Sequence, residues 1–207
     1  PWARALAAGS CWRRPGLRAA AAAPSGAAHS RVPRRFFQEL GDAILKGTPE
    51  KQLTVASQTG DGAEVGRLLD GGADPNVFGA SGVTPLIMAA VNGHEGVARR
   101  LLASFALPNA ALQNGASPLF LAAQQGHAGV VKALLGAGAD VDQARFDGAT
   151  PLFAAAKNGH EEAVRLLLAA GAAASQATAA GDLPVQAAEA NGHEAVAALL
   201  REAGGAE

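Results

Sequence analysis

The sequence has little cysteine and few aromatic residues. Cys11 is the only cysteine among 207 residues, tyrosine is absent, and aromatic residues make up 4% of the chain. A disulfide framework or a cysteine metal cluster within one chain is therefore excluded. Alanine and glycine are abundant instead, and such small side chains favour closely stacked helices over one large globular core.

Long apolar runs are missing, as are acidic residues at the beginning of the chain. No apolar run approaches the ~20 residues of a membrane-spanning helix, so we expect no membrane span.

The first acid, Glu39, is preceded by seven arginines: Arg4, Arg13, Arg14, Arg18, Arg31, Arg34 and Arg35. From Glu39 onward, 10 basic and 18 acidic residues give a formal charge of −8. The negative charge of the chain from Glu39 onward predicts that nucleic acid is not its ligand. Most of the affinity of a protein for nucleic acid comes from basic side chains that neutralise phosphates.

Two short motifs recur with a period of 33 residues. The first reads Gly-x-Thr/Ser-Pro-Leu, relaxed to Gly-Asp-Leu-Pro-Val in the last copy, and its copies begin at Gly82, Gly115, Gly148 and Gly181. The second is a Gly-His pair nine residues after the Thr, Ser or Leu, beginning at Gly93, Gly126, Gly159 and Gly192. Two motifs locked to one period define a repeat array.

Each repeat is predicted to fold as a polar turn followed by two helices. The Thr or Ser hydroxyl caps the first helix, and the Pro occupies the first helical position, where a missing N–H has no effect. The Gly of the Gly-His pair ends this helix in the left-handed conformation. The His then begins a second helix, which carries inward Val and Leu side chains.

These patterns together resemble the ankyrin repeat over residues ~48–203, with Thr84-Pro85-Leu86, Gly93-His94 and Gly71-Gly72-Ala73-Asp74 as the residues that carry the resemblance. The resemblance implies an all-α solenoid of stacked helix-turn-helix pairs, with β-turn or hairpin fingers at right angles. It also implies a protein partner bound on the finger tips and the concave face of the first helices. We expect a monomer that needs no cofactor.

The chain divides into three predicted segments. Residues 1–33 form a disordered basic arm, residues 34–47 form a helix that covers the start of the array, and residues 48–207 form the array. The repeats span about 48–79, 80–112, 113–145, 146–178 and 179–207. The arm has the composition of an organelle transit peptide, or of a plain disordered arm or linker. Localisation is accordingly mitochondrion or plastid in the first case and cytoplasmic in the second.

Several positions depart from the family pattern. The His that usually follows Thr-Pro-Leu is replaced by Ile87, Phe120, Phe153 and Gln186. Apolar packing between repeats is expected to replace its hydrogen bonding. Leu183 replaces the capping Thr of the last unit, which should cost about 1 kcal/mol. Phe105 stands where Gly72, Gly138 and Gly171 end second helices, and a left-handed non-glycine residue costs roughly 1–2 kcal/mol.

The recurring histidines suggest a metal site only at first sight. His94, His127, His160 and His193 occupy equivalent positions of a stack, so neighbours lie about one helix diameter apart, ~10 Å. They cannot share one ion, so we expect no metal and a structural role at the turn between helices. The sequence also has no phosphate loop, no serine elbow and no His-Glu-x-x-His motif. We therefore predict that the chain is not an enzyme.

The partner surface is predicted from finger and first-helix positions that vary between repeats. These positions are Phe78, Ser81, Val83, Val91, Gln113, Asn114, Gln124, Gln125, Arg145, Phe146, Asp147, Lys157 and Asn158. Phe146 with Arg145 and Lys157 is the leading cluster, because aromatic residues and arginine are enriched in binding hot spots. The alternative is that Phe146 packs on the next finger.

Two further hypotheses follow from the resemblance. Leu68, Asp74 and Asn76 match the spacing at which an asparaginyl hydroxylase modifies ankyrin fingers, whereas Asn109 matches less well because Leu107 replaces the acid. The competing interpretation is that Asn76 stabilises the turn through its side chain. At the level of the protein, the alternative to an independent binding scaffold is a regulatory or substrate-adaptor fragment of a larger multidomain enzyme.

Overall fold

The computed structural model of the chain describes residues 48–204. The predicted basic arm (1–33) and covering helix (34–47) lie outside the described residues, as do residues 205–207. The described residues therefore belong to the predicted array alone.

Ten α-helices follow one another in pairs along the described residues. The first helices of the pairs are α2 (Pro49–Thr59), α4 (Pro85–Asn92), α6 (Pro118–Gln125), α8 (Pro151–Lys157) and α10 (Pro184–Ala190). The second helices are α3 (Gly62–Asp70), α5 (Glu95–Ala103), α7 (Ala128–Gly136), α9 (Glu161–Ala169) and α11 (Glu194–Gly204). One 3-10 turn, η1 (Ala80–Gly82), precedes α4, and residues 48–204 contain no strand.

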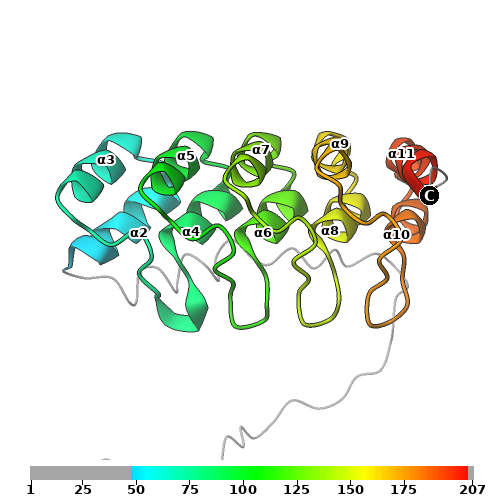
Figure 1. The fold of residues 1–207 in the computed structure, drawn as a ribbon, viewed down its shortest axis with the longest axis horizontal. Helices are drawn as coiled ribbons and strands as arrows, with labels where there is room; N and C mark the ends of the chain where they lie inside the picture. The colour runs from blue at the N-terminus through cyan, green and yellow to red at the C-terminus, as the bar shows by residue number, and fades with distance from the viewer. Residues whose placement is uncertain (1–47, 205–207) are drawn as a thin grey trace, which may run out of the picture. The chain divides into compact units, whose positions relative to one another are not determined.

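The helices form two parallel rows (Figure 1). Each first helix packs against its own second helix and against the first helix of the next repeat, and each second helix also packs against the next one in its row. The loops that join one pair to the next project beyond the row of first helices (Figure 1). The predicted all-α stack of helix pairs is thus confirmed.

The first helices begin and end by the predicted chemistry. The hydroxyl groups of Thr84, Ser117 and Thr150 accept hydrogen bonds from the backbone N–H three residues on, at 3.2, 3.1 and 3.1 Å. A proline follows each of these caps. Gly93 and Gly126 end α4 and α6 with φ of 76°, in the left-handed region where glycine carries no steric penalty.

Several other helix starts lack a side-chain cap. Thr48 occupies the cap position of α2, but its hydroxyl makes no capping hydrogen bond. The second helices begin one residue after each His, and the His side chains do not cap them. Leu183 has no side-chain acceptor, but Gln186 Oε1 accepts a hydrogen bond from Leu183 N at 3.1 Å. The first turn of α10 therefore keeps one half of a capping box.

Two apolar clusters hold the repeats together. The larger runs between the two rows and contains the inward leucines and valines of the second helices. It also contains a pair of fully buried alanines from each of α4, α6 and α8, namely Ala89-Ala90, Ala122-Ala123 and Ala155-Ala156. The smaller lies at the bases of the fingers and contains Ile87, Phe120 and Phe153, which are also buried. Apolar packing at the position that histidine usually occupies is thereby confirmed for these three residues, whereas Gln186 is exposed and its Oε1 accepts a hydrogen bond from Leu183 N.

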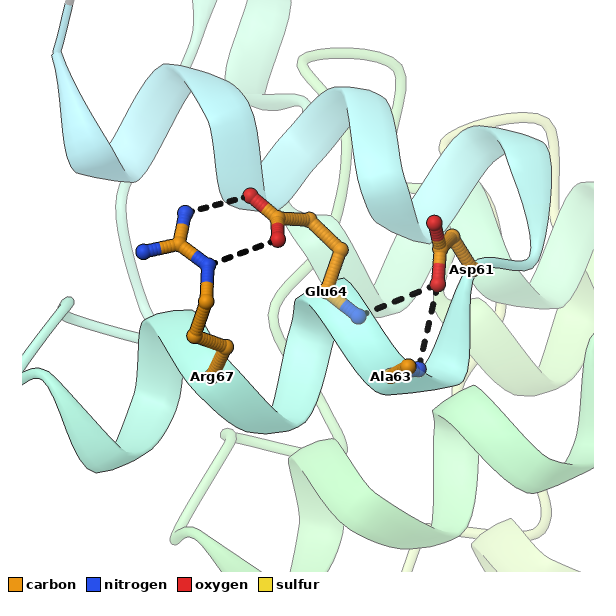
Figure 2. Close-up of polar contacts among 4 residues, drawn as sticks. All are labelled: Asp61, Ala63, Glu64 and Arg67. Atoms are coloured by element: carbon orange, nitrogen blue, oxygen red, sulfur yellow. Dashed lines mark hydrogen bonds and ion pairs between the residues drawn. The ribbon is translucent and has the colours of Figure 1, made fainter.

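The first repeat has a polar edge on its second helix. Asp61 stands 33 residues before His94, and its carboxylate accepts hydrogen bonds from Ala63 N at 3.1 Å and Glu64 N at 3.0 Å, which caps α3 (Figure 2). Glu64 stands one period before the buried Val97 and pairs with Arg67 on the surface (Figure 2). Both side chains of this pair are at least partly exposed to solvent.

Candidate protein-binding surface

Each finger is closed by the same two backbone hydrogen bonds. In the finger that contains Phe146, Arg145 N donates to Ala149 O at 2.9 Å, and Gly148 N donates to Arg145 O at 2.8 Å. Equivalent bonds close the fingers over residues 79–83, 112–116 and 178–182. The fingers are therefore short hairpin turns with defined backbones, although they contain no regular strand.

Adjacent fingers are also joined to one another. Gln113 N donates to Ser81 O at 3.1 Å, Phe146 N donates to Asn114 O at 3.1 Å, and Ala179 N donates to Asp147 O at 2.8 Å. One hydrogen bond therefore links each finger to the next along the stack. We use the name finger row for the exposed finger tips together with the exposed last residues of α6 and α8, namely Ser81, Gln113, Asn114, Phe146, Asp147, Gln125 and Lys157.

Phe146 is the most exposed large side chain of the finger row. It is 81% exposed, yet its ring contacts the preceding finger, because a Cβ added to Gly115 would lie 2.9 Å from the ring. The ring therefore rests on the backbone at Gly115 while its other face is open to solvent. The alternative that Phe146 packs on the next finger is wrong, because its ring contacts the preceding finger. Its exposure leaves contact with a partner as a prediction.

The side chain of Arg145 is only partly exposed and makes its contacts within the fold. Its Nε donates to Asp147 Oδ1 at 2.9 Å, its Nη2 pairs with Asp147 Oδ2, and its guanidinium carbon lies 5.3 Å from the centroid of the Phe120 ring. The hydrogen bond from Arg145 is the main reason that the pKa of Asp147 falls to about 2. Arg145 therefore covers the smaller apolar cluster, and its substitution would disturb the finger as well as any binding.

The remaining predicted partner positions fall into three groups. Phe78 is 60% exposed, and Ser81, Gln113, Asn114, Gln125 and Lys157 are exposed as well. Val91, Gln124 and Asn158 are half-buried at the ends of their helices. Val83 is only 7% exposed, and its side chain is not available to a partner. The next two fingers have small buried residues at the same position, Ala116 and Ala149.

The histidines connect neighbouring repeats. His94 Nε2 lies 2.9 Å from Gln58 O, His127 Nε2 lies 3.1 Å from Val91 O, and His160 Nε2 lies 3.0 Å from Gln124 O. A carbonyl can only accept, so each Nε2 carries the proton. The structural role is as expected, but the partner is the preceding repeat and not the turn beside the histidine.

A second ladder of side chains was not anticipated. Asn76 Oδ1 accepts from Leu107 N at 2.7 Å, Asn109 Oδ1 accepts from Asp140 N at 2.9 Å, and Asp142 Oδ1 accepts from Ala173 N at 3.1 Å. The only signal in the sequence is that residues 76, 109 and 142 recur with the 33-residue period. Sequence spacing does not reveal that their acceptors point toward the next repeat.

The side-chain amide of Asn76 is occupied on both sides. Its Nδ2 donates to Phe105 O at 3.0 Å while its Oδ1 accepts from Leu107 N. This geometry favours turn stabilisation over an accessible modification site. Hydroxylation at Asn76 stays a prediction, to be checked by a mass shift of one oxygen.

The described part of the chain has no grouping of three His, Cys, Asp or Glu side chains that could hold a metal ion. None of its helices is long and apolar enough to cross a membrane.

The family model described as ankyrin repeats (3 copies) matches residues 53–145 and 141–207. The chain belongs to the ankyrin-repeat family. This match covers the array from the first helix pair to the end of the sequence and agrees with the helix pairs, fingers and turns described above. None of the curated proteins compared with the chain matches it. Ankyrin repeats in general are protein–protein interaction modules and are typically not catalytic.

Proposed function

We propose that this ankyrin array is a non-catalytic module that binds one protein partner on its finger row. The single observation that supports this most strongly is Phe146, an aromatic residue 81% exposed on a finger whose backbone is fixed on both sides. An exposed aromatic side chain of this kind contributes little to folding, whereas aromatic anchors dominate binding energy at protein interfaces.

The rigidity of the finger row supports the same proposal. Hydrogen bonds join every finger to its neighbour, and the first six residues of α4, α6 and α8, which follow three of the fingers, are all buried. A surface that is ordered before binding loses less conformational entropy when a partner docks. The array can therefore present side chains from three repeats to one partner in a constant arrangement.

The chemistry of the finger row suits a protein surface. Gln113, Asn114 and Gln125 offer amide donors and acceptors, and Lys157 offers one cation at the C-terminal end of α8. The carboxylate of Asp147 is paired with Arg145. Mixed amide groups around an aromatic anchor are typical of a protein interface with a polar rim.

The experiment that tests this function is affinity capture from the lysate of the source cell with the full chain. The native chain is compared with Phe146→Ala, and Phe105→Gly serves as a control because it removes a similarly exposed phenylalanine that lies outside the finger row, in the loop after α5. We expect one protein to be retained by the native chain and by Phe105→Gly, and to be lost with Phe146→Ala. Retention of the same protein by all three chains would contradict binding on the finger row.

A further inference from the structure

The loop after α5 exposes two large apolar side chains. Phe105 is 86% exposed and Leu107 is 54% exposed, on either side of the buried Ala106. We use the name turn ridge for the four segments that follow second helices, namely residues 70–76, 103–109, 136–142 and 169–175. None of these residues belongs to the finger row.

The backbone at Phe105 is strained without an evident structural gain. Its φ is 65°, in the left-handed region, where the equivalent residues Gly72, Gly138 and Gly171 have φ of 86°, 79° and 87°. A non-glycine residue in this conformation costs roughly 1–2 kcal/mol. The ring is 86% exposed, so packing of the side chain does not offset this cost. Residues of this kind cluster at functional sites.

Leu107, like Phe105, is a large apolar residue at a position where the neighbouring repeats have none. The equivalent residues of the neighbouring repeats are Asp74 and Asp140, both exposed. One turn of the ridge has thus exchanged a glycine and an acid for a phenylalanine and a leucine. Two exposed apolar residues at adjacent surface positions indicate an interaction site more strongly than one alone.

The surrounding hydrogen bonds hold this apolar pair in place. Asn76 Nδ2 donates to Phe105 O at 3.0 Å, and Leu107 N donates to Asn76 Oδ1 at 2.7 Å. On the other side, Asp140 N donates to Asn109 Oδ1 at 2.9 Å. The loop is therefore tied to the turns before and after it, and its apolar side chains are displayed on a fixed backbone.

The charge of the turn ridge has one sign. Its four segments contain Asp70, Asp74, Asp140 and Asp142 and no Lys, Arg or His. On the adjoining second helices, Arg67, Arg99 and Arg165 pair with glutamates of their own helices, which leaves Arg100 and Lys132 as the cations nearby in sequence. The apolar pair thus lies between the exposed acids Asp74 and Asp140.

We propose that the turn ridge is a second docking surface, which binds a basic segment of a partner protein. Phe105 and Leu107 would enter an apolar pocket or face of that segment, and its flanking Lys or Arg side chains would lie against Asp74 and Asp140. An anionic membrane or a nucleic acid would meet negative charge here and is disfavoured. This inference does not depend on the function proposed for the finger row.

The probe for this surface is a fluorescein-labelled amphipathic peptide of leucine and lysine, measured by fluorescence anisotropy with the full chain. Matched peptides replace lysine by glutamate in one case and leucine by serine in the other. We expect only the leucine–lysine peptide to bind, and Phe105→Gly to weaken its binding at least about tenfold, as the loss of a hot-spot anchor does. Phe105→Gly removes backbone strain, so weaker binding could not be ascribed to unfolding.

Charge and position are tested by neutral variants. Asp74→Asn and Asp140→Asn should each weaken binding and lower its salt dependence, whereas Asp182→Asn and Phe146→Ala, on the fingers, should change neither. Unchanged affinity in Phe105→Gly would overturn the proposal. So would tight binding of the glutamate peptide, or a dimer of the full chain that Phe105→Gly dissociates while peptide binding persists. That last result would make the ridge a contact between copies of this chain.

Discussion

Phe105 and Phe146 are both exposed aromatic residues, but they differ in what they contribute to the fold. Phe146 rests on Gly115 of the preceding finger, in a hairpin that has its glycine at position 148. Phe105 takes the place of a glycine and adopts a left-handed backbone. Single substitutions at these two residues therefore distinguish effects on binding from effects on stability.

The substitution Phe105→Gly should stabilise the chain. Relief of the left-handed strain is worth about 1–2 kcal/mol, which corresponds to a rise in Tm of roughly 2–8 °C for a chain of this length. Thermal unfolding followed by circular dichroism measures the change. A lower Tm would show that the ring packs against the fold and that its exposure is not the native state.

His160 should make stability depend on pH near neutrality. Burial lowers its pKa below the usual 6.5, helped by the neighbouring His127 and His193 and opposed by the hydrogen bond to Gln124 O. Because the unfolded chain then binds the proton more readily, this contribution is complete well above pH 6.5 and is lost as the pH falls through 6.5 toward the folded-state value.

Urea unfolding at pH 7.5 and pH 5.5 measures this dependence. We expect the native chain to be less stable at pH 5.5, and His160→Gln to show a smaller difference between the two pH values. The carboxylate of Asp147 does not affect this comparison. Its pKa is about 2 in the folded chain and 3.8 ordinarily, so its contribution to stability changes only between these values, below both pH values measured. An equal pH dependence in His160→Gln would rule out His160 as the cause.

The helices owe their ends to a small number of side chains. The hydroxyl groups of Thr84, Ser117 and Thr150 cap α4, α6 and α8, whereas Leu183 offers no acceptor at the start of α10. Gln186 already accepts from Leu183 N, so a threonine at position 183 would complete the reciprocal pair of a capping box.

We therefore expect Leu183→Thr to stabilise the last repeat by about 1 kcal/mol. Amide hydrogen exchange in the first turn of α10 should slow, because one more N–H becomes bonded. Leu183→Ala, which adds no acceptor, is the matched control. Faster exchange in Leu183→Thr than in the native chain would mean that packing of the leucine side chain stabilises the start of α10 more than a threonine cap does.

The contact between a helix end and the next histidine can be tested with two glycines. Gly126 (φ 76°) and Gly138 (φ 79°) share the left-handed backbone, but a Cβ at Gly126 would lie 2.5 Å from His160 Nδ1, while one at Gly138 would meet nothing within 4 Å. Gly138→Ala should cost roughly 1–2 kcal/mol from backbone strain alone.

Gly126→Ala should cost more than Gly138→Ala, because the imidazole must also leave Gln124 O. The free energy of unfolding in urea, measured for both variants, decides between the two contributions. Equal losses would show that the imidazole moves aside freely and that its hydrogen bond contributes little to the contact between repeats.

At the scale of the array, much of the fold could be predicted from the sequence. Caps such as Thr84 and Ser117, the left-handed Gly93 and the packing of Phe120 were predictable because each depends on chemistry within one repeat or on strict periodicity. A side chain that bonds to the next repeat is different. Asn76 reaches a loop 29 to 31 residues away, and only the spacing of stacked repeats brings the two together.

The partner surface was less predictable for the same reason. Exposure of Phe146 and Lys157 agrees with their position in the repeat, but Val83 is buried and Arg145 lies over the ring of Phe120. Both residues vary between repeats, as surface residues do, yet their side chains serve packing between repeats. Variation along an array therefore indicates candidate contacts without showing which side chains are free.

The central claim is that one partner binds across the finger row of a stack ordered beforehand. Amide hydrogen exchange of the full chain, with and without the protein retained by the affinity capture, tests it most directly. The account predicts slower exchange at the finger tips around residues 113–114, 146–147 and 179–180, with α5, α7 and α9 unchanged. Slower exchange confined to the second helices or the turn ridge, with the fingers unchanged, would contradict it.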